Sequence, residues 1–245
     1  MNTSKGVALV TGASGGIGAA IALRLATDGF AVCANYASNS AAAAQVVQRI
    51  ASAGGTAVAL KADVSDPSAA ARLFSDLRER LGTPTVLAHA AGVMPLTKIV
   101  EGNLEAFDRV IAVNLRGTYI LLGHAARELP KGGRIIALSS SVLAKSFPGY
   151  GPYIASKAGV EGLIRVLANE LRGRGVCVNA IAPGPVATPL FLKGKTTEQV
   201  ADLAKVAPLE RLGEPEDIAK VASFLAGPDG AWVNGQVLRA NGGFA

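Results

Sequence analysis

Three glycines near the N-terminus constrain the fold more than any other feature of this chain. The apolar run Val7-Ala8-Leu9-Val10 leads directly into Thr11-Gly12-Ala13-Ser14-Gly15-Gly16-Ile17-Gly18, and a helical pattern follows from about Ile17 to Asp28. An unbroken apolar run is typical of a parallel strand that is covered on both faces. Glycine is needed where the backbone turns tightly or a ligand approaches it closely, and the amides of a helix N-terminus bind anions. A strand, a glycine loop and a helix in this order predict a dinucleotide-binding site.

Strand and helix patterns alternate along the rest of the chain. The predicted strands lie at Ala31–Ala34, Ala57–Leu60, Val86–Ala88, Ile135–Leu138, Val176–Ile181 and Gln236–Leu238. The predicted helices lie at about Ala41–Ala53, Pro67–Leu81, Leu104–Glu128, Tyr153–Arg174 and Pro215–Leu225. Such alternation produces right-handed crossovers and a parallel sheet. We therefore expect one α/β domain over residues 1–245, a doubly wound seven-stranded parallel sheet with helices on both faces.

One irregular region interrupts this alternation, from about residue 184 to 214. It contains several prolines and glycines and a short amphipathic stretch, Thr197–Val206. We expect it to form a lid over a substrate cleft.

Composition excludes several classes of function. The net charge of +6 is spread over scattered Lys and Arg residues without a dense basic run, so no nucleic-acid partner is expected. No apolar stretch approaches the ~18 residues of a membrane span. Cys33 and Cys177 lie in apolar runs, which indicates buried free thiols and a reducing compartment, by default the cytoplasm. His89 and His124 lack metal-ligand spacing, so no metal site is expected.

Tyr153 and Lys157 lie four residues apart, at the start of a predicted helix. This spacing places both side chains on one helix face. A free phenol holds its proton to a pH near ~10, and a neighbouring ammonium group should lower that pKa. The pair could therefore act as a general acid/base. A solvated surface pair is the simpler interpretation of these two residues alone, but the glycine loop favours the catalytic one.

Taken together, Thr11-Gly12-x-x-x-Gly16-x-Gly18 and Tyr153-x-x-x-Lys157 resemble the short-chain dehydrogenase/reductase family over essentially the whole chain. The ending Val233-Asn234-Gly235-Gln236-x-Leu238-x-x-Asn241-Gly242-Gly243 is most similar to the 3-oxoacyl-carrier-protein reductase branch. The resemblance implies a Rossmann fold with strand order 3-2-1-4-5-6-7 and a homotetramer. It also implies reversible hydride transfer between a nicotinamide and a carbonyl or secondary alcohol.

The resemblance also assigns four catalytic residues. Ser140, the middle residue of Ser139-Ser140-Ser141, would hydrogen-bond the carbonyl oxygen, and Tyr153 would donate a proton to it. Lys157 would bias the tyrosine pKa and hold the nicotinamide ribose. Asn114 would position a water molecule that resupplies the proton.

The implied cofactor contacts follow the carboxyl ends of the strands. Asp63 matches the acid that holds the adenine amino group, Asn179 and the turn Pro183-Gly184 lie beside the nicotinamide, and Thr188 matches a contact to its amide. The expected set is Gly12, Ser14, Gly15, Gly16, Ile17, Gly18, Asn35, Tyr36, Ser38, Asp63, Val64, Ala90, Ala91, Gly92, Tyr153, Lys157, Pro183, Gly184, Val186 and Thr188.

Two departures from the family pattern matter. Where the family usually has Asn-Asn-Ala-Gly, this chain has His89-Ala90-Ala91-Gly92, so the small residues are kept and the asparagine contacts are lost. His89 either replaces those contacts or is an ordinary core histidine. The segment from Asn35 to Ser40 has no acid for the ribose hydroxyls, which favours NADP(H) and leaves NAD(H) open. Many NADP-preferring members carry a basic residue where this chain has Gly15.

The substrate is expected to be a small carbonyl compound or alcohol. An apolar site is predicted at Val142, Leu143, Phe147, Tyr150, Pro185 and Leu190-Phe191-Leu192, although ordinary loop packing explains each residue equally well. An acyl chain, a ring ketone or a hydrophobic alcohol would fit. Lys131 and Arg174 either meet an acidic carrier protein or are solvated surface charges.

Other functions remain open on the same fold. One is a sugar, polyol or steroid dehydrogenase, since the fold does not determine the substrate. The other is a non-catalytic dinucleotide-binding protein, which would be expected to have lost Ser140, Tyr153 or Lys157.

Overall fold

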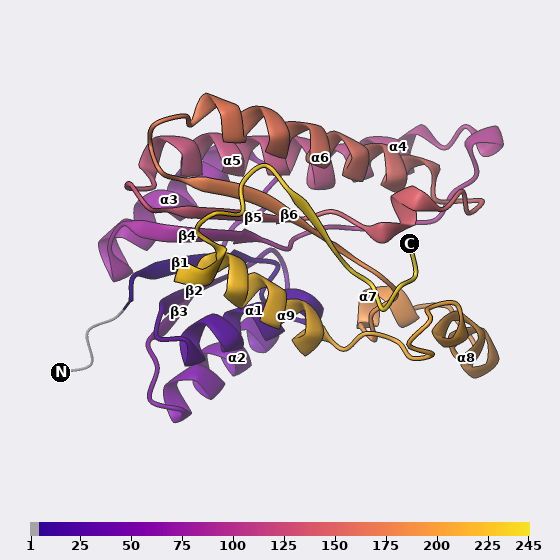
Figure 1. The fold of residues 1–245 in the computed structure, drawn as a ribbon, viewed down its shortest axis with the longest axis horizontal. Coiled ribbons are helices and arrows are strands. Elements are labelled where there is room, and N and C mark those ends of the chain that lie inside the picture. The colour runs from indigo at the N-terminus through magenta and orange to yellow at the C-terminus, as the bar shows by residue number, and fades with distance from the viewer. Residues whose placement is uncertain (1–4) are drawn as a thin grey trace.

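The computed structural model describes residues 5–245 and contains one seven-stranded sheet (Figure 1). Its strands are β1 (Val7–Thr11), β2 (Ala31–Tyr36), β3 (Ala57–Lys61), β4 (Pro84–His89), β5 (Arg134–Leu138), β6 (Cys177–Pro183) and β7 (Val237–Ala240). All neighbouring strands pair in parallel, in the order β3-β2-β1-β4-β5-β6-β7. The predicted fold class and strand order are confirmed.

Helices cover both faces of the sheet (Figure 1). One layer holds α1 (Gly16–Thr27), α2 (Ser40–Ser52) and α9 (Pro215–Ala226), and the other holds α3 (Pro67–Leu81), α4 (Leu104–Val110), α5 (Gly117–Glu128) and α6 (Gly151–Glu170). Strand β1 supplies side chains to both layers, because Ala8 and Val10 pack in one core cluster and Val7 and Leu9 in the other. Burial on both faces explains why this strand is apolar at every position before Thr11.

The helix predicted over Leu104–Glu128 is interrupted. Between α4 and α5 lies a π-helical turn, η2 (Ile111–Arg116), which contains Asn114. Such turns insert one extra residue into a helix and are frequent at functional sites. The helix predicted to end at Arg174 ends at Glu170, because Gly173 and Gly175 adopt positive φ angles of 81° and 65°.

The remaining elements are short. They are η1 (Ile99–Glu101), η3 (Ser141–Ala144), α7 (Pro189–Leu192), α8 (Thr197–Lys205) and η4 (Pro228–Gly230). Within residues 5–245, no helix combines the length and the apolar character needed to cross a membrane.

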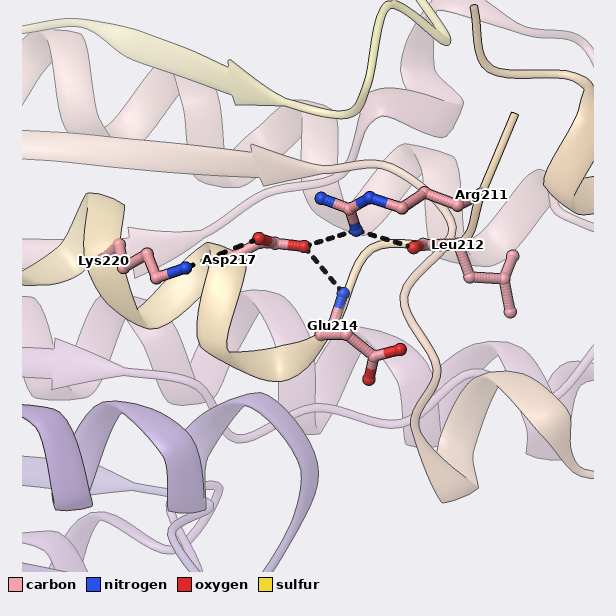
Figure 2. Close-up of polar contacts among 5 residues, drawn as sticks. All are labelled: Arg211, Leu212, Glu214, Asp217 and Lys220. Carbon is pink, nitrogen blue, oxygen red and sulfur yellow. Dashed lines mark hydrogen bonds and ion pairs between the residues drawn. The ribbon is translucent and has the colours of Figure 1, made fainter. Parts of the chain in front are cut away.

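The segment predicted as a lid carries α7 and α8. Hydrogen bonds of Gly213 and Asp217 hold the base of this segment against the core. Val186 and Gly213 form a parallel bridge, in which the Gly213 amide donates to the Pro185 carbonyl at 2.8 Å. Beyond it, Asp217 Oδ2 accepts hydrogen bonds from Arg211 Nη1 at 2.7 Å and from the Glu214 amide at 2.9 Å (Figure 2). These contacts cap α9 and fix the point at which the segment rejoins the core.

Candidate active site

A cavity of about 730 Å³ opens at the carboxyl edge of the sheet. The chain runs outward from β1 to β3 and then returns to β4 beside β1, so this edge contains the topological switch point where such sheets bind ligands. The predicted residues that line the cavity are Gly12, Ser14, Gly15, Gly16, Ile17, Gly18, Asn35, Ser38, Asp63, Val64, Ala90, Ala91, Gly92, Ser140, Tyr153, Lys157, Pro183, Gly184, Val186 and Thr188. The predicted substrate-site residues Val142, Phe147, Tyr150, Pro185, Leu190 and Phe191 also line it. The predicted residues that lie outside the lining are Tyr36, Asn114, Leu143, Asn179 and Leu192.

The glycine loop brings bare backbone to the cavity. Gly12 has a φ of 65°, and a Cβ there would lie 2.8 Å from the backbone of Ala91. A Cβ on Gly18 would lie 2.3 Å from the Gly12 carbonyl oxygen. Helix α1 then begins without a side-chain cap, so its first amides remain available for an anion. This arrangement fits the diphosphate of a dinucleotide.

Asp63 lies at the end of the cavity that would hold an adenine. Its Oδ1 accepts hydrogen bonds from the Ser65 amide at 2.9 Å and the Ser65 hydroxyl at 2.7 Å. These bonds orient the carboxylate and leave Oδ2 as an acceptor for an amino group.

Asn35 and Asn39 contribute less to the ribose end than their polarity suggests. Asn35 is 1% exposed, and its Nδ2 donates to the carbonyls of Leu60 and Ala62 at 3.2 and 3.1 Å. Asn39 caps α2 by accepting from the Ala42 amide. Both residues line the cavity, and so does Ser38, which offers a hydroxyl group in this loop.

Ser140 is the serine of the triplet best placed for catalysis. Ser139 donates to Glu161 Oε1 at 2.7 Å, and Ser141 donates to the Ala182 carbonyl at 2.7 Å. Ser140 caps η3, lines the cavity and hydrogen-bonds Tyr153. The structure therefore brings Ser140, Tyr153 and Lys157 together on one cavity wall.

Burial controls the protonation of Tyr153 and Lys157. It raises the pKa of Tyr153 to about 12, against an opposing effect of the Ser140 hydrogen bond. It lowers the pKa of Lys157 to about 8. Lys157 Nζ lies 5.8 Å from the Tyr153 ring centroid and donates to the Leu138 carbonyl at 2.7 Å. The prediction that the pKa of Tyr153 is lowered is wrong for this arrangement, because desolvation of the phenolate is the largest effect on it.

Asn114 is fully buried, and its amide is used to hold neighbouring segments. Oδ1 accepts from the Val93 amide at 2.8 Å, and Nδ2 donates to the Val93 carbonyl at 2.9 Å and to Ser156 Oγ at 3.2 Å. Ser156 in turn donates to the Tyr153 carbonyl at 2.7 Å. Asn114 therefore connects the loop after β4 to the first turn of α6.

His89 lies in the core behind the cavity. Its Nδ1 is 2.7 Å from the Thr11 hydroxyl, while its Nε2 is buried without a hydrogen-bond partner among residues 5–245. Burial, followed by repulsion from Lys157, lowers the pKa of His89 to about 3, so the ring is neutral. His89 thus behaves as a core histidine and not as a replacement for the asparagine contacts.

Several cavity residues escaped the sequence analysis, among them Arg109 on α4 and Phe244 near the C-terminus. Neither belongs to a local motif, and no short-range signal could have revealed them. Arg174 was expected to be a solvated charge or a carrier-protein contact, but the structure uses it inside the protein. Its guanidinium donates to the carbonyls of Ala126 and Leu129, the latter at 2.7 Å, and so caps the end of α5.

Comparison with known proteins agrees with this geometry. The sequence profile of a family described as enoyl-(acyl carrier protein) reductase matches residues 12–245. A short-chain type dehydrogenase/reductase from Picea abies is 43% identical over 97% of this chain and 91% of its own length. A protein from Arabidopsis thaliana named NADPH-dependent aldehyde reductase-like protein, chloroplastic, is 40% identical over 97% of this chain and 93% of its own length.

A solved structure is similar over nearly the same span. The crystal structure of a short chain dehydrogenase from Burkholderia cenocepacia J2315 in complex with NADP superposes with a TM-score of 0.93 at 33% identity, covering 100% of this chain and 99% of that one. Profile, sequence identity and fold all agree over nearly the full length, so the chain belongs to the short-chain dehydrogenase/reductase family.

Proposed function

We propose that this protein reduces ketone or aldehyde carbonyls with NADPH. One observation carries the proposal: Ser140, Tyr153 and Lys157 share a cavity with a glycine loop that leaves helix N-terminal amides open to an anion. The NADPH named for the Arabidopsis relative and the NADP of the Burkholderia structure support the choice of cofactor. The absence of an acid from Asn35 to Ser40 supports it independently.

The protonation of Tyr153 favours reduction over oxidation. With a pKa of about 12, the phenol carries its proton at neutral pH and can donate it to a carbonyl oxygen. The Ser140 hydroxyl is placed to hydrogen-bond the same oxygen. Both hydrogen bonds strengthen as negative charge develops there, which lowers the barrier. The bound dinucleotide supplies the hydride.

Lys157 and Asn114 support this proton donor. The Lys157 ammonium is held by the Leu138 carbonyl and can bind the hydroxyls of a ribose. Both side-chain amide protons of Asn114 are used inside the protein, so a water molecule held by this residue would have to donate to one of its oxygen atoms. Its main-chain carbonyl already accepts the Thr118 hydroxyl at 2.6 Å.

A panel of carbonyl compounds with NADPH oxidation as the readout tests the proposal. It should include aldehydes, ring ketones, a sugar, a steroid ketone, a 3-oxoacyl thioester and a 2-enoyl thioester, which separate the named alternatives. The thioesters test the carrier-protein branch of the family. Reduction of the enoyl thioester alone would overturn the carbonyl proposal.

Three variants separate an enzyme from a binding protein. Tyr153→Phe keeps the ring but removes the transferable proton, so turnover should fall by roughly 10²–10⁴ while NADPH affinity stays near wild type. Ser140→Ala should lower turnover without weakening NADPH binding, and Lys157→Ala should weaken both. Undiminished turnover in Tyr153→Phe contradicts the mechanism. A wild-type protein that binds NADPH and reduces nothing supports the non-catalytic alternative.

We also propose a cytoplasmic homotetramer. Exposed apolar side chains support self-association, among them Trp232 at 98%, Val100 at 89% and Ile99 at 83% exposure. The buried free thiols Cys33 and Cys177 suit a reducing compartment. Light scattering coupled to size exclusion tests the assembly, and a monomeric mass at micromolar concentration would exclude it.

A further inference from the structure

Aromatic side chains are concentrated at the catalytic cavity. The chain contains only seven Phe, four Tyr and one Trp. Five of these twelve line this one cavity, namely Phe147, Tyr150, Tyr153, Phe191 and Phe244. Because the chain has so few aromatic residues, this concentration indicates that the site contacts its ligand through aromatic rings as well as aliphatic side chains.

Four of the rings form a continuous row. Phe244 lies 6.3 Å from Phe147 between ring centroids, Phe147 lies 6.0 Å from Tyr150, and Tyr150 lies 6.4 Å from Tyr153. The planes are inclined by 46°, 55° and 73° respectively, so the rings meet in tilted and edge-to-face contacts. These distances lie within the attractive range for aromatic pairs. The row begins in the C-terminal segment and ends at the phenol that donates the proton.

We call the row of Phe244, Phe147, Tyr150 and Tyr153 the aromatic wall, and Phe244 is a fixed part of it. The C-terminal segment folds back toward the edge of the sheet where α7 lies (Figure 1). There Asn241 Nδ2 donates to Ser141 Oγ at 2.9 Å and to the Ala245 carbonyl at 2.7 Å. Lys145 Nζ lies over the Phe244 ring at 5.1 Å from its centroid, and Phe244 is only 5% exposed. A ring fixed in this way is preorganised for a ligand.

We propose that Phe244 determines substrate specificity, and that with Phe147 and Tyr150 it selects a flat aromatic ring ketone over a saturated one of similar size. The proposal rests on the proposed reductase function and adds the substrate class to it. A flat ring can make offset or edge-to-face contacts with this wall, which a puckered saturated ring cannot reproduce. Because the row ends at Tyr153, a ketone fused to such a ring would present its oxygen near the phenol.

The test compares 2-tetralone with trans-2-decalone. Both are bicyclic ketones with the carbonyl at the same position, and only the first has an aromatic ring. The wild type should show a higher kcat/KM for 2-tetralone. Phe244→Leu should lower the ratio of the two kcat/KM values by roughly two- to tenfold, the effect of one aromatic contact. Phe224→Leu, on α9 and outside the cavity lining, is the matched control and should keep the wild-type ratio.

Folding defects and failure of the parent proposal remain distinguishable. NADPH affinity near wild type shows that a variant is folded, and Phe147→Leu provides a second variant of the wall. Equal kcat/KM values for the two ketones in the wild type would contradict the proposed role of the aromatic wall. A ratio that is unchanged in both Phe244→Leu and Phe147→Leu would contradict it too. Neither result would contradict the proposed reductase function. If the wild type reduces no carbonyl at all, calorimetric titration of both ketones with NADP⁺ present still tests the wall, and tetralone binding no tighter than decalone binding would overturn it.

Discussion

The buried environment of Lys157 sets its pKa, and this pKa should be visible in the pH dependence of the reaction. Burial lowers its pKa to about 8, so the ammonium form is complete below that pH and is lost as the pH rises through it. The kcat/KM for NADPH reports ionisations of the free enzyme. In the reductive direction it should be constant from pH 6 to 7 and fall above about pH 8. A fall that begins only near pH 10 would contradict the assigned burial effect.

The reverse reaction provides a control for this profile. Oxidation of an alcohol requires the Tyr153 phenolate as the proton acceptor, and its pKa is raised to about 12. The oxidative kcat, measured with saturating NADP⁺, should therefore still be rising at pH 10. Lys157→Arg keeps a charge across this range, so any residual reductive activity of that variant should lack the inflection near pH 8.

We predict that the residue at position 15 influences how tightly the 2′-phosphate is held. It lies in extended backbone with φ 178°, and a Cβ there would meet no heavy atom within 4 Å. Gly15→Arg should therefore fold and place a guanidinium near the phosphate. A charge-assisted hydrogen bond should lower the Kd for NADPH about tenfold and leave that for NADH unchanged.

The opposite substitution completes this test. Tyr36→Asp should shift preference toward NADH, because an acid at the end of β2 can bind ribose hydroxyls and repels a phosphate. Fluorescence titration of both cofactors against both variants gives the four dissociation constants. Equal or tighter NADH binding by the wild type would refute the NADPH preference itself.

At the scale of elements, the segment predicted as a lid has fewer buried contacts than the base where it joins the core. Helix α8 has no buried residue, and Leu190 and Leu209 are 48% and 64% exposed. A segment with so few buried contacts should open easily. We expect amides from Pro189 to Ala207 to exchange fast without ligand and to be protected when NADPH binds.

The base supplies the internal control for this exchange experiment. The Gly213 amide already donates to the Pro185 carbonyl, and the Glu214 amide donates to Asp217 (Figure 2). The protection of these two amides should therefore be similar in both states. Equal protection of the α7–α8 region with and without NADPH would show that this segment is not a lid.

At the scale of the whole molecule, cofactor binding should stabilise the fold. The cavity is built from loops that follow β1 to β6, so a ligand there links the ends of most strands. At a hundredfold excess over Kd, binding stabilises the native state by about 2.7 kcal/mol, which corresponds to a rise in Tm of roughly 5–10 °C. Differential scanning fluorimetry measures this rise in Tm. The same concentration of NADH should give a smaller shift, and an equal shift would contradict the preference for NADPH.

The sequence by itself determined the features that depend on residues close together along the chain, namely the strands, the helices and the glycine loop. The unbroken apolar run of β1 is a consequence of burial on both faces, and the alternation of strand and helix patterns leads to a parallel sheet. The glycine loop could be assigned for the same reason, since positions such as Gly12 and Gly18 do not tolerate a Cβ. The resemblance carried by these motifs extended the prediction to Ser140, Tyr153 and Lys157.

Only the tertiary structure decided how these groups behave, because burial and long-range contact are not encoded by spacing. A helical spacing placed Lys157 beside Tyr153 but could not show that desolvation would raise the phenol pKa. Composition could not show that the amides of Asn35 and Asn114 are consumed by carbonyls far away in the chain. Phe244 enters the cavity from about ninety residues beyond Tyr153, at a distance over which no pattern in the sequence operates.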